Sequence, residues 1–108
     1  MTLTSADTPI IMSDKHSKTK TSFYRRLYVA HLISNDVNSV PAITEATGMP
    51  RRTAQDTIGN LKELHIDCEF IGGTKNGNYR INDWGPICPI WIDKNLAMIT
   101  NTLGYPSI

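Results

Sequence analysis

The chain has 108 residues, of which 40% are hydrophobic and 19% are charged, and its formal net charge is +1. This length favours one domain with a tail over two domains, and the composition is that of an ordinary folded protein. The near-neutral charge excludes a uniformly positive surface, so a case for nucleic-acid binding has to come from where the cations lie.

Two cysteines, Cys68 and Cys88, are too few for a disulfide framework and lack C-x-x-C spacing, which indicates free thiols and a reducing compartment. His65 lies near Cys68, but no second pair of ligands follows at a suitable spacing, so we expect no metal site and no cofactor. The sequence has no apolar run long enough to span a membrane and no secretion signal at its start. We therefore expect a cytoplasmic protein without a membrane partner.

Residues 1–21 are mostly Thr, Ser, Asp and Lys with little periodicity, which predicts a flexible basic and polar tail. Ser22 is then a suitable N-cap for a first helix, which Asn35 and Asp36 would end. The apolar positions of this helix recur at three- and four-residue steps, at Phe23, Leu27, Ala30 and Ile33.

A second, short helix is predicted at Pro41–Thr47, after an extended piece at Asn38–Val40, because proline fits the first helical turn. Gly48 supplies a left-handed backbone at its end, and Pro50 starts a third helix at about Arg51–Leu64. The third helix has an apolar side at Ala54, Ile58, Leu61 and Leu64, and a polar side at Arg52, Gln55, Asp56 and Asn60.

Two runs of alternating apolar and polar residues, Ile66–Ile71 and Tyr79–Trp84, have the period of half-buried strands. The segment Gly72–Asn78 between them carries three glycines and two asparagines, which accept positive backbone angles. The two runs are therefore predicted to form a β-hairpin.

Residues 86–108 form the last predicted unit, a C-terminal helical extension with Asp93 as its N-cap and Gly104 and Pro106 at its end. Its apolar residues are too many to remain in water: Trp91, Ile92, Leu96, Ile99 and Leu103. Such a helix either folds back on its own domain or pairs with the same helix of a second copy. We favour a homodimer formed through this helix.

The order of these elements, and above all the stretch Val40–Ile58, resembles the helix-turn-helix core of bacterial winged helix-turn-helix transcription regulators. The resemblance covers about Ser22–Trp84. It implies an α+β fold, mostly α, in which residues 22–85 form a three-helix core with a β-hairpin wing. It is carried by a small residue in the second helix, the glycine of the turn, an apolar residue after it and three positions of the third helix: Ala46, Gly48, Met49, Thr53, Ala54 and Ile58.

In such regulators the third helix, here about residues 51–64, enters the major groove of double-stranded DNA. The wing, here residues 72–78, contacts the backbone or the minor groove. By this resemblance, the arginines would contact guanine or phosphate, Gln55 adenine, Asp56 cytosine, and the threonines phosphates. The DNA-binding residues carried over are Thr44, Arg51, Arg52, Thr53, Gln55, Asp56, Lys75 and Arg80.

Several of these cations and acids also have explanations without DNA. Asp56 lies four residues after Arg52, so a solvated ion pair within the helix accounts for both. Lys75 and Arg80 also fit an exposed hairpin on which they have no function. The cations from Lys15 to Arg26 fit either an arm along the DNA backbone or a solvated helix face.

The sequence shows no nucleophile with a base, no paired carboxylates, no phosphate loop and no metal cluster, so we do not expect an enzyme. The leading hypothesis is a sequence-specific, double-stranded DNA-binding transcriptional regulator. The alternative is a winged-helix module for protein–protein interaction without DNA binding, which the acids Asp67 and Glu69 on the predicted strands favour. A ligand-responsive switch would need a pocket, and its candidate aromatic residues are Tyr79, Trp84, Trp91 and Tyr105.

Overall fold

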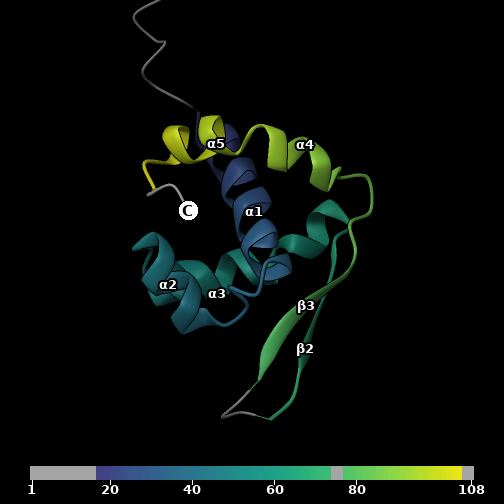
Figure 1. Cartoon of the computed structure of the whole chain (residues 1–108). Helices are drawn as coiled ribbons and strands as arrows, with labels where there is room; N and C mark the ends of the chain where they lie inside the picture. The colour runs from purple at the N-terminus through teal and green to yellow at the C-terminus, as the bar shows by residue number, and fades with distance from the viewer. Residues whose placement is uncertain (1–16, 74–76, 106–108) are drawn as a thin grey trace, which may run out of the picture.

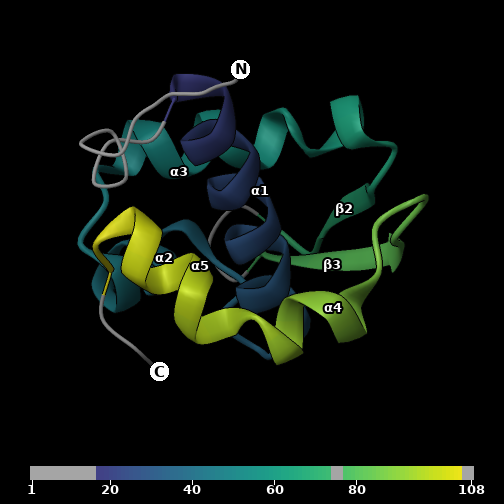
Figure 2. The same ribbon diagram turned by 90° about the horizontal axis from the view of Figure 1, so that it is seen from above.

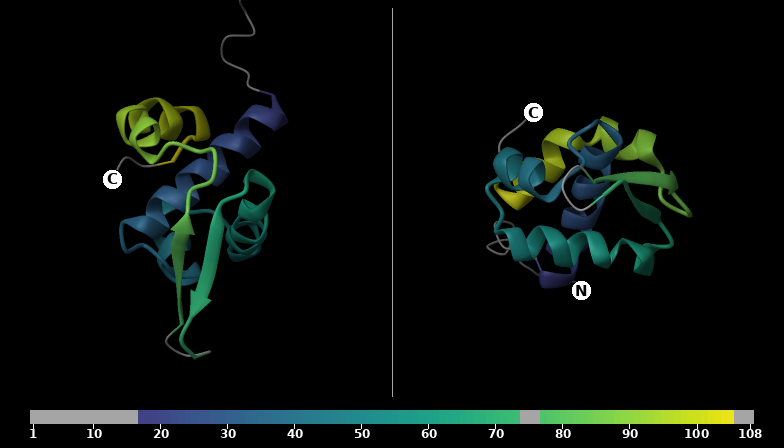
Figure 3. Two further views of the ribbon diagram at one scale, coloured as in Figure 1. Left: turned by 90° about the vertical axis from the view of Figure 1, so that its right-hand side faces the viewer. Right: turned by 90° about the horizontal axis from the view of Figure 1, so that it is seen from below.

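The computed structural model describes residues 17–73 and 77–105. In chain order the elements are α1 (Lys18–Ser34), α2 (Val40–Thr47), α3 (Arg51–Gly59), the 3-10 helix η2 (Leu61–Leu64), β2 (Asp67–Ile71), β3 (Asn78–Asp83), α4 (Pro89–Lys94) and α5 (Leu96–Leu103) (Figure 1). α1 lies at the centre, with α3 packed on one side of it and α4 and α5 on the other (Figures 2 and 3). This confirms the predicted α+β fold, mostly α, with a three-helix core, a hairpin and a helical C-terminus.

The burial of α1 explains its central position. Four consecutive residues, Leu27–Ala30, are each at most 1% exposed. Because an α-helix has 3.6 residues per turn, successive side chains point about 100° apart, and four in a row cover most of the circumference. α1 is therefore packed on all sides at its middle, which a helix with a single apolar stripe would not require.

α1 begins earlier than the sequence pattern predicted. The hydroxyl oxygen of Ser17 accepts a hydrogen bond from the backbone N–H of Lys20 at 3.0 Å, so Ser17 is the N-cap. Ser22 lies inside the helix, and the predicted cap at Ser22 is wrong. The apolar periodicity starts only at Phe23, whereas the polar first turn is held by its cap and contributes no apolar pattern.

The turn between α2 and α3 has the predicted geometry. Gly48 has φ +81°, a left-handed conformation that costs glycine little, and its N–H donates to the carbonyl of Thr44. The hydroxyl of Thr47 accepts from the N–H of Met49 at 3.1 Å and so fixes the start of the turn. Met49 is buried in the core, as the resemblance implied. α2 itself begins at Val40, because Ser39 caps it, so the predicted extended piece at 38–40 is one residue too long.

The third helix is shorter than predicted. α3 ends at Gly59, and Asn60 leads into η2, which carries the apolar residue Leu61 into the core at 0% exposure. Glycine and asparagine both have low helix propensity, and two in succession favour a change of helix type. His65, with φ +63°, ends η2 in a left-handed conformation.

β2 and β3 form the predicted antiparallel hairpin, with Cys68 opposite Ile81 and Phe70 opposite Tyr79. The N–H of Tyr79 donates to the carbonyl of Asn38 at 2.7 Å, which ties the hairpin to the segment before α2. The hairpin continues beyond the helices (Figure 1). Phe70 belongs to the apolar side of its alternating run, yet it is 47% exposed.

The C-terminal extension consists of two short helices instead of one. α4 ends at Lys94, Asn95 breaks the helix, and α5 follows, so Asp93 lies within α4 and is not an N-cap. Ile92 of α4 and Ile99 of α5 are both fully buried against the core. Gly104, with φ +75°, ends α5 as predicted. The extension therefore folds back onto α1.

Candidate nucleic-acid interface

The solvent side of α3 carries the central residues of the predicted DNA interface. Arg51, Arg52, Gln55 and Asp56 are all exposed. At 3.6 residues per turn they lie within an arc of about 140° around the helix axis. The opposite side is buried through Ala54, so the helix presents one polar face to solvent.

The charges on this face are unpaired. In residues 17–73 and 77–105, ion pairs within 4.0 Å join Arg26 to Glu63 and Arg80 to Glu69, and none includes a residue of α3. The alternative of an ion pair between Arg52 and Asp56 is therefore not formed. Both side chains keep their full hydrogen-bonding capacity for a partner.

The N-terminus of α3 lies at the same place as the two arginines. Its N-cap is Pro50, which is exposed and makes no side-chain capping bond. The first-turn N–H groups of the helix consequently lack a capping side chain, and the helix dipole adds positive potential there. Two guanidinium groups and a free helix N-terminus together suit a phosphate or the acceptor edge of a base.

The two threonines of the predicted interface, Thr44 and Thr53, are less exposed than the residues of this face. The Oγ1 atom of Thr44 is buried and has no hydrogen-bond partner among the described residues, so it is not positioned to donate to a phosphate. Thr53 is half-buried, and its carbonyl accepts from the hydroxyl of Thr57 at 2.7 Å. The structure thus brings four of the predicted residues together on the exposed face of α3, namely Arg51, Arg52, Gln55 and Asp56. The hydroxyl of Thr44 is not part of that face.

Arg80 of the hairpin is part of a small polar network. Its Nε donates to the Oδ1 of Asn82 at 2.8 Å, and its guanidinium contacts Glu69 at 3.3 Å. The Asn82 side-chain amide also donates to Glu69 at 2.9 Å. These contacts, first from Asn82 and then from Arg80, lower the pKa of Glu69. Lys75, the other predicted contact of the wing, lies outside the described residues.

Three cations of α1 have contacts within the molecule. The Nε of Arg25 donates to the hydroxyl of Tyr105 at 3.4 Å, and Arg26 pairs with Glu63 at 3.4 Å. The ammonium of Lys20 lies 5.7 Å from the centre of the Tyr24 ring. The described part of this cluster is therefore a helix face, not an arm.

A groove of about 320 Å³ separates the end of α3 from the hairpin. Gln55, Gly59 and Lys62 line one side, and Cys68 and Phe70 line the other. Burial raises the pKa of the Cys68 thiol to about 11, so this cysteine remains protonated and unreactive at neutral pH. Phe70 is a surface residue of this groove, although the alternation put it on the apolar side of its strand. Alternation identifies the two sides of a strand, but it does not show where the core ends.

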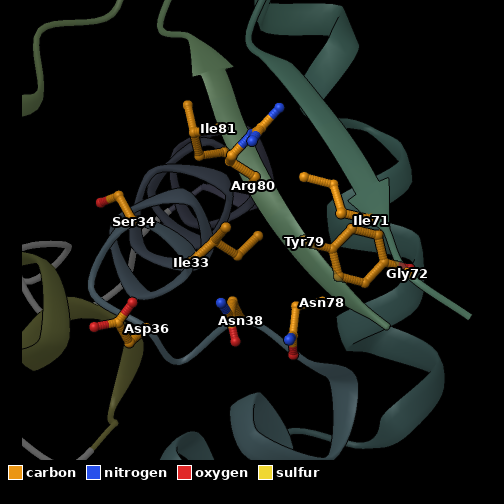
Figure 4. A pocket seen from close by; sticks show the side chains of 10 residues that line it. All are labelled: Ile33, Ser34, Asp36, Asn38, Ile71, Gly72, Asn78, Tyr79, Arg80 and Ile81. Atoms are coloured by element: carbon orange, nitrogen blue, oxygen red, sulfur yellow. The ribbon is translucent and has the colours of Figure 1, made fainter. Parts of the chain in front are cut away.

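A second hollow, of about 510 Å³, lies between the end of α1 and the hairpin (Figure 4). Asp36 is on one side, and Tyr79 and Arg80 are on the other, with the guanidinium of Arg80 directed away from Asp36. No charged groups converge in it. Trp91 lines a separate groove near α4, so the aromatic residues considered for a ligand pocket do not meet in one place.

The described residues show no other site chemistry. No helix in residues 17–73 and 77–105 has the length and apolar character that crossing a membrane requires. The same residues contain no group of three side chains able to hold a metal ion, and both cysteines are free.

Comparisons with known proteins agree with this architecture. A family model described as a winged helix-turn-helix matches residues 18–103, which includes α4 and α5. The structure is similar to that of a DUF2131 family protein from Shewanella amazonensis SB2B, with a TM-score of 0.80 and 36% sequence identity over 88% of this chain and 95% of that chain. No curated protein matches the sequence.

Proposed function

Because the chain belongs to the winged helix-turn-helix family, whose domains are generally DNA-binding modules without enzymatic activity, we propose that it is a sequence-specific regulator of transcription. α3 is the recognition helix in this proposal, and double-stranded DNA is the partner. Regulation follows from occupancy of an operator and involves no covalent chemistry.

The observation that carries the proposal is the open polar face of α3. It is exposed, its charges are unpaired, and α4 and α5 lie on the opposite side of α1 (Figures 2 and 3). A C-terminal segment packed over α3 would have contradicted the proposal. The major groove of B-DNA is about 12 Å wide and accepts such a helix without distortion of the protein.

Each residue of this face has a chemical role in the proposal. Arg51 and Arg52, at the helix start, contact phosphate or the acceptor edge of guanine. Gln55 has the donor and acceptor that adenine requires, and Asp56 accepts from cytosine. Positioning and base recognition thus come from one helix, and the hairpin adds backbone contacts through Arg80 and Lys75.

The proposal also concerns the setting of the protein. We expect a bacterial, cytoplasmic regulator, in line with the free thiols and the bacterial source of the similar structure. A homodimer remains part of the proposal. Since the inner faces of α4 and α5 are packed on α1, a second copy would have to use their outer surface.

Binding to DNA tests the proposal directly. The protein is titrated into a labelled random-sequence duplex at two salt concentrations, and bound fragments are then selected from a genomic library. We expect binding that weakens steeply with salt, because each phosphate contact releases counterions, and enrichment of a common sequence among the selected fragments.

The alternative, a docking module for proteins, predicts a different outcome. It gives no duplex binding even at low salt, and no enriched sequence. Binding without enrichment would retain DNA as the partner but contradict a sequence-specific regulator.

A further inference from the structure

An apolar groove opens beside α4, on the side of α1 away from α3. Its volume is about 380 Å³, and it is lined by Phe23, Leu27, Pro86, Ile87, Cys88 and Trp91. Apart from the cysteine, these residues are large hydrophobic residues or proline. Trp91 is 44% exposed, so a large apolar side chain faces solvent on this surface.

Ile90, the residue next to the groove, projects into solvent. Ile90 is 64% exposed, more than any other large hydrophobic residue within residues 17–73 and 77–105, and it directly precedes Trp91. Met98 of α5 adds a further apolar surface residue at 40% exposure. Exposed apolar side chains next to an apolar groove are typical of a binding surface, not of a solvated one.

We propose that a second copy of this chain binds here, and that the resulting dimer holds two separate DNA duplexes. A contact about a two-fold axis requires a surface that is its own complement. Here Ile90 of each copy would enter the groove of the other. α4 also exposes one acid and one base in succession, Asp93 and Lys94, so two identical surfaces attract through these charges and do not repel.

The second half of the proposal follows from symmetry and rests on the proposed DNA-binding function. When a two-fold axis lies in the plane of a contact, it turns the second copy over. The two copies then face each other across the plane, and their far sides point in opposite directions. α3 lies on the side of α1 opposite α4 and α5 (Figures 2 and 3). Its polar face is the exposed side of the helix, turned away from the buried Ala54. In the dimer the two α3 faces therefore point in opposite directions. They would not lie side by side on successive turns of one duplex, about 34–36 Å apart, as in dimers that bind a palindromic site.

The contact between copies is tested without DNA, by sedimentation equilibrium of the full chain from micromolar to hundreds of micromolar concentrations. We expect twice the mass of the chain at the higher concentrations. Ile90→Glu should weaken association at least about tenfold, because it places a charge at the centre of the contact. Ile71→Glu, the same exchange at an exposed position of β2, should not.

Two outcomes of this experiment would overturn the contact. The first is a monomer at all concentrations. The second is a monomer that becomes a dimer in Ile11→Glu, which would show that the chain's own N-terminal segment fills the groove. Circular dichroism confirms that each variant is folded, so a change in mass reports the contact.

Holding of two duplexes is tested with one random-sequence duplex fixed to a surface and a second, labelled duplex in solution. The wild type should retain the labelled duplex. Ile90→Glu should bind a single duplex with unchanged affinity and retain at least about tenfold less of the second. A dimer that binds DNA but captures no second duplex would overturn the opposed arrangement. A chain that binds no duplex at all would refute the proposed function, while the sedimentation result would still decide the contact.

Discussion

The exposed arginines of α3 and of the hairpin differ in one respect, which is whether an acid within the molecule already contacts them. Arg51 and Arg52 have no ion-pair partner in the described part of the chain, whereas Arg80 is paired with Glu69. Arg26 of α1, which is half-buried, is likewise paired, with Glu63. Exposure alone therefore does not identify a DNA contact.

The difference has a physical consequence for binding. A free guanidinium contributes its whole attraction to a phosphate, while a paired one must first lose a partner or share it. Because ion pairs between exposed side chains are weak, Arg80 can still be released. The hairpin is therefore expected to contribute less than α3, with Glu69 reducing its contribution.

The largest expected effect comes from removing the free cations. Arg51→Ala combined with Arg52→Ala should weaken duplex binding about 100-fold and lower the salt slope by about 2. Fluorescence anisotropy at several salt concentrations measures both quantities. Lys94→Ala, which removes an exposed cation on the opposite side of the molecule, should change affinity less than about twofold.

The next effect concerns base recognition. Gln55→Ala should reduce the preference for a selected sequence over random duplex about tenfold, because a paired contact to a base is lost. Competition between the two duplexes measures this ratio. Asn82→Ala on the hairpin is the matched amide removal and should leave the ratio unchanged. An equal loss in both variants would mean that the hairpin contributes to sequence discrimination.

A smaller effect of the opposite sign is expected from Glu69→Gln. This exchange removes a negative charge from the hairpin and frees Arg80, so affinity for duplex DNA should rise about threefold and the salt slope should steepen. Glu63→Gln, which frees Arg26 on α1, is the control and should have no effect if α1 does not contact DNA. No gain in Glu69→Gln would show that the hairpin stays away from the duplex.

The smallest effect is expected from Arg80→Ala alone. Because Glu69 compensates this cation, its removal should weaken binding less than about twofold in the wild-type background. In the Glu69→Gln background the same exchange should cancel the gain in affinity, and a double-mutant cycle measures this coupling. A large loss in the wild-type background would contradict the contrast between the hairpin and α3.

Local signals in the sequence determined the helix-turn-helix and the hairpin. Gly48 and Met49 specify a turn through backbone freedom and burial of one side chain, and both requirements are met within a few residues. The alternation of the two strands likewise predicted the hairpin. The same signals predicted the exposed face of α3, since helical spacing separates its polar side from its apolar side.

Tertiary structure decided what depends on residues distant in the chain. The burial of the Thr44 hydroxyl and the pairing of Arg80 with Glu69 both arise from neighbours that a local pattern does not contain. The fate of the C-terminal extension is the clearest case. Its apolar residues required a partner, and only the packing of α1, buried on all sides at its middle, supplied one within the same chain. A hydrophobic stripe specifies that burial must occur, but it does not specify against what, because the hydrophobic effect has no direction.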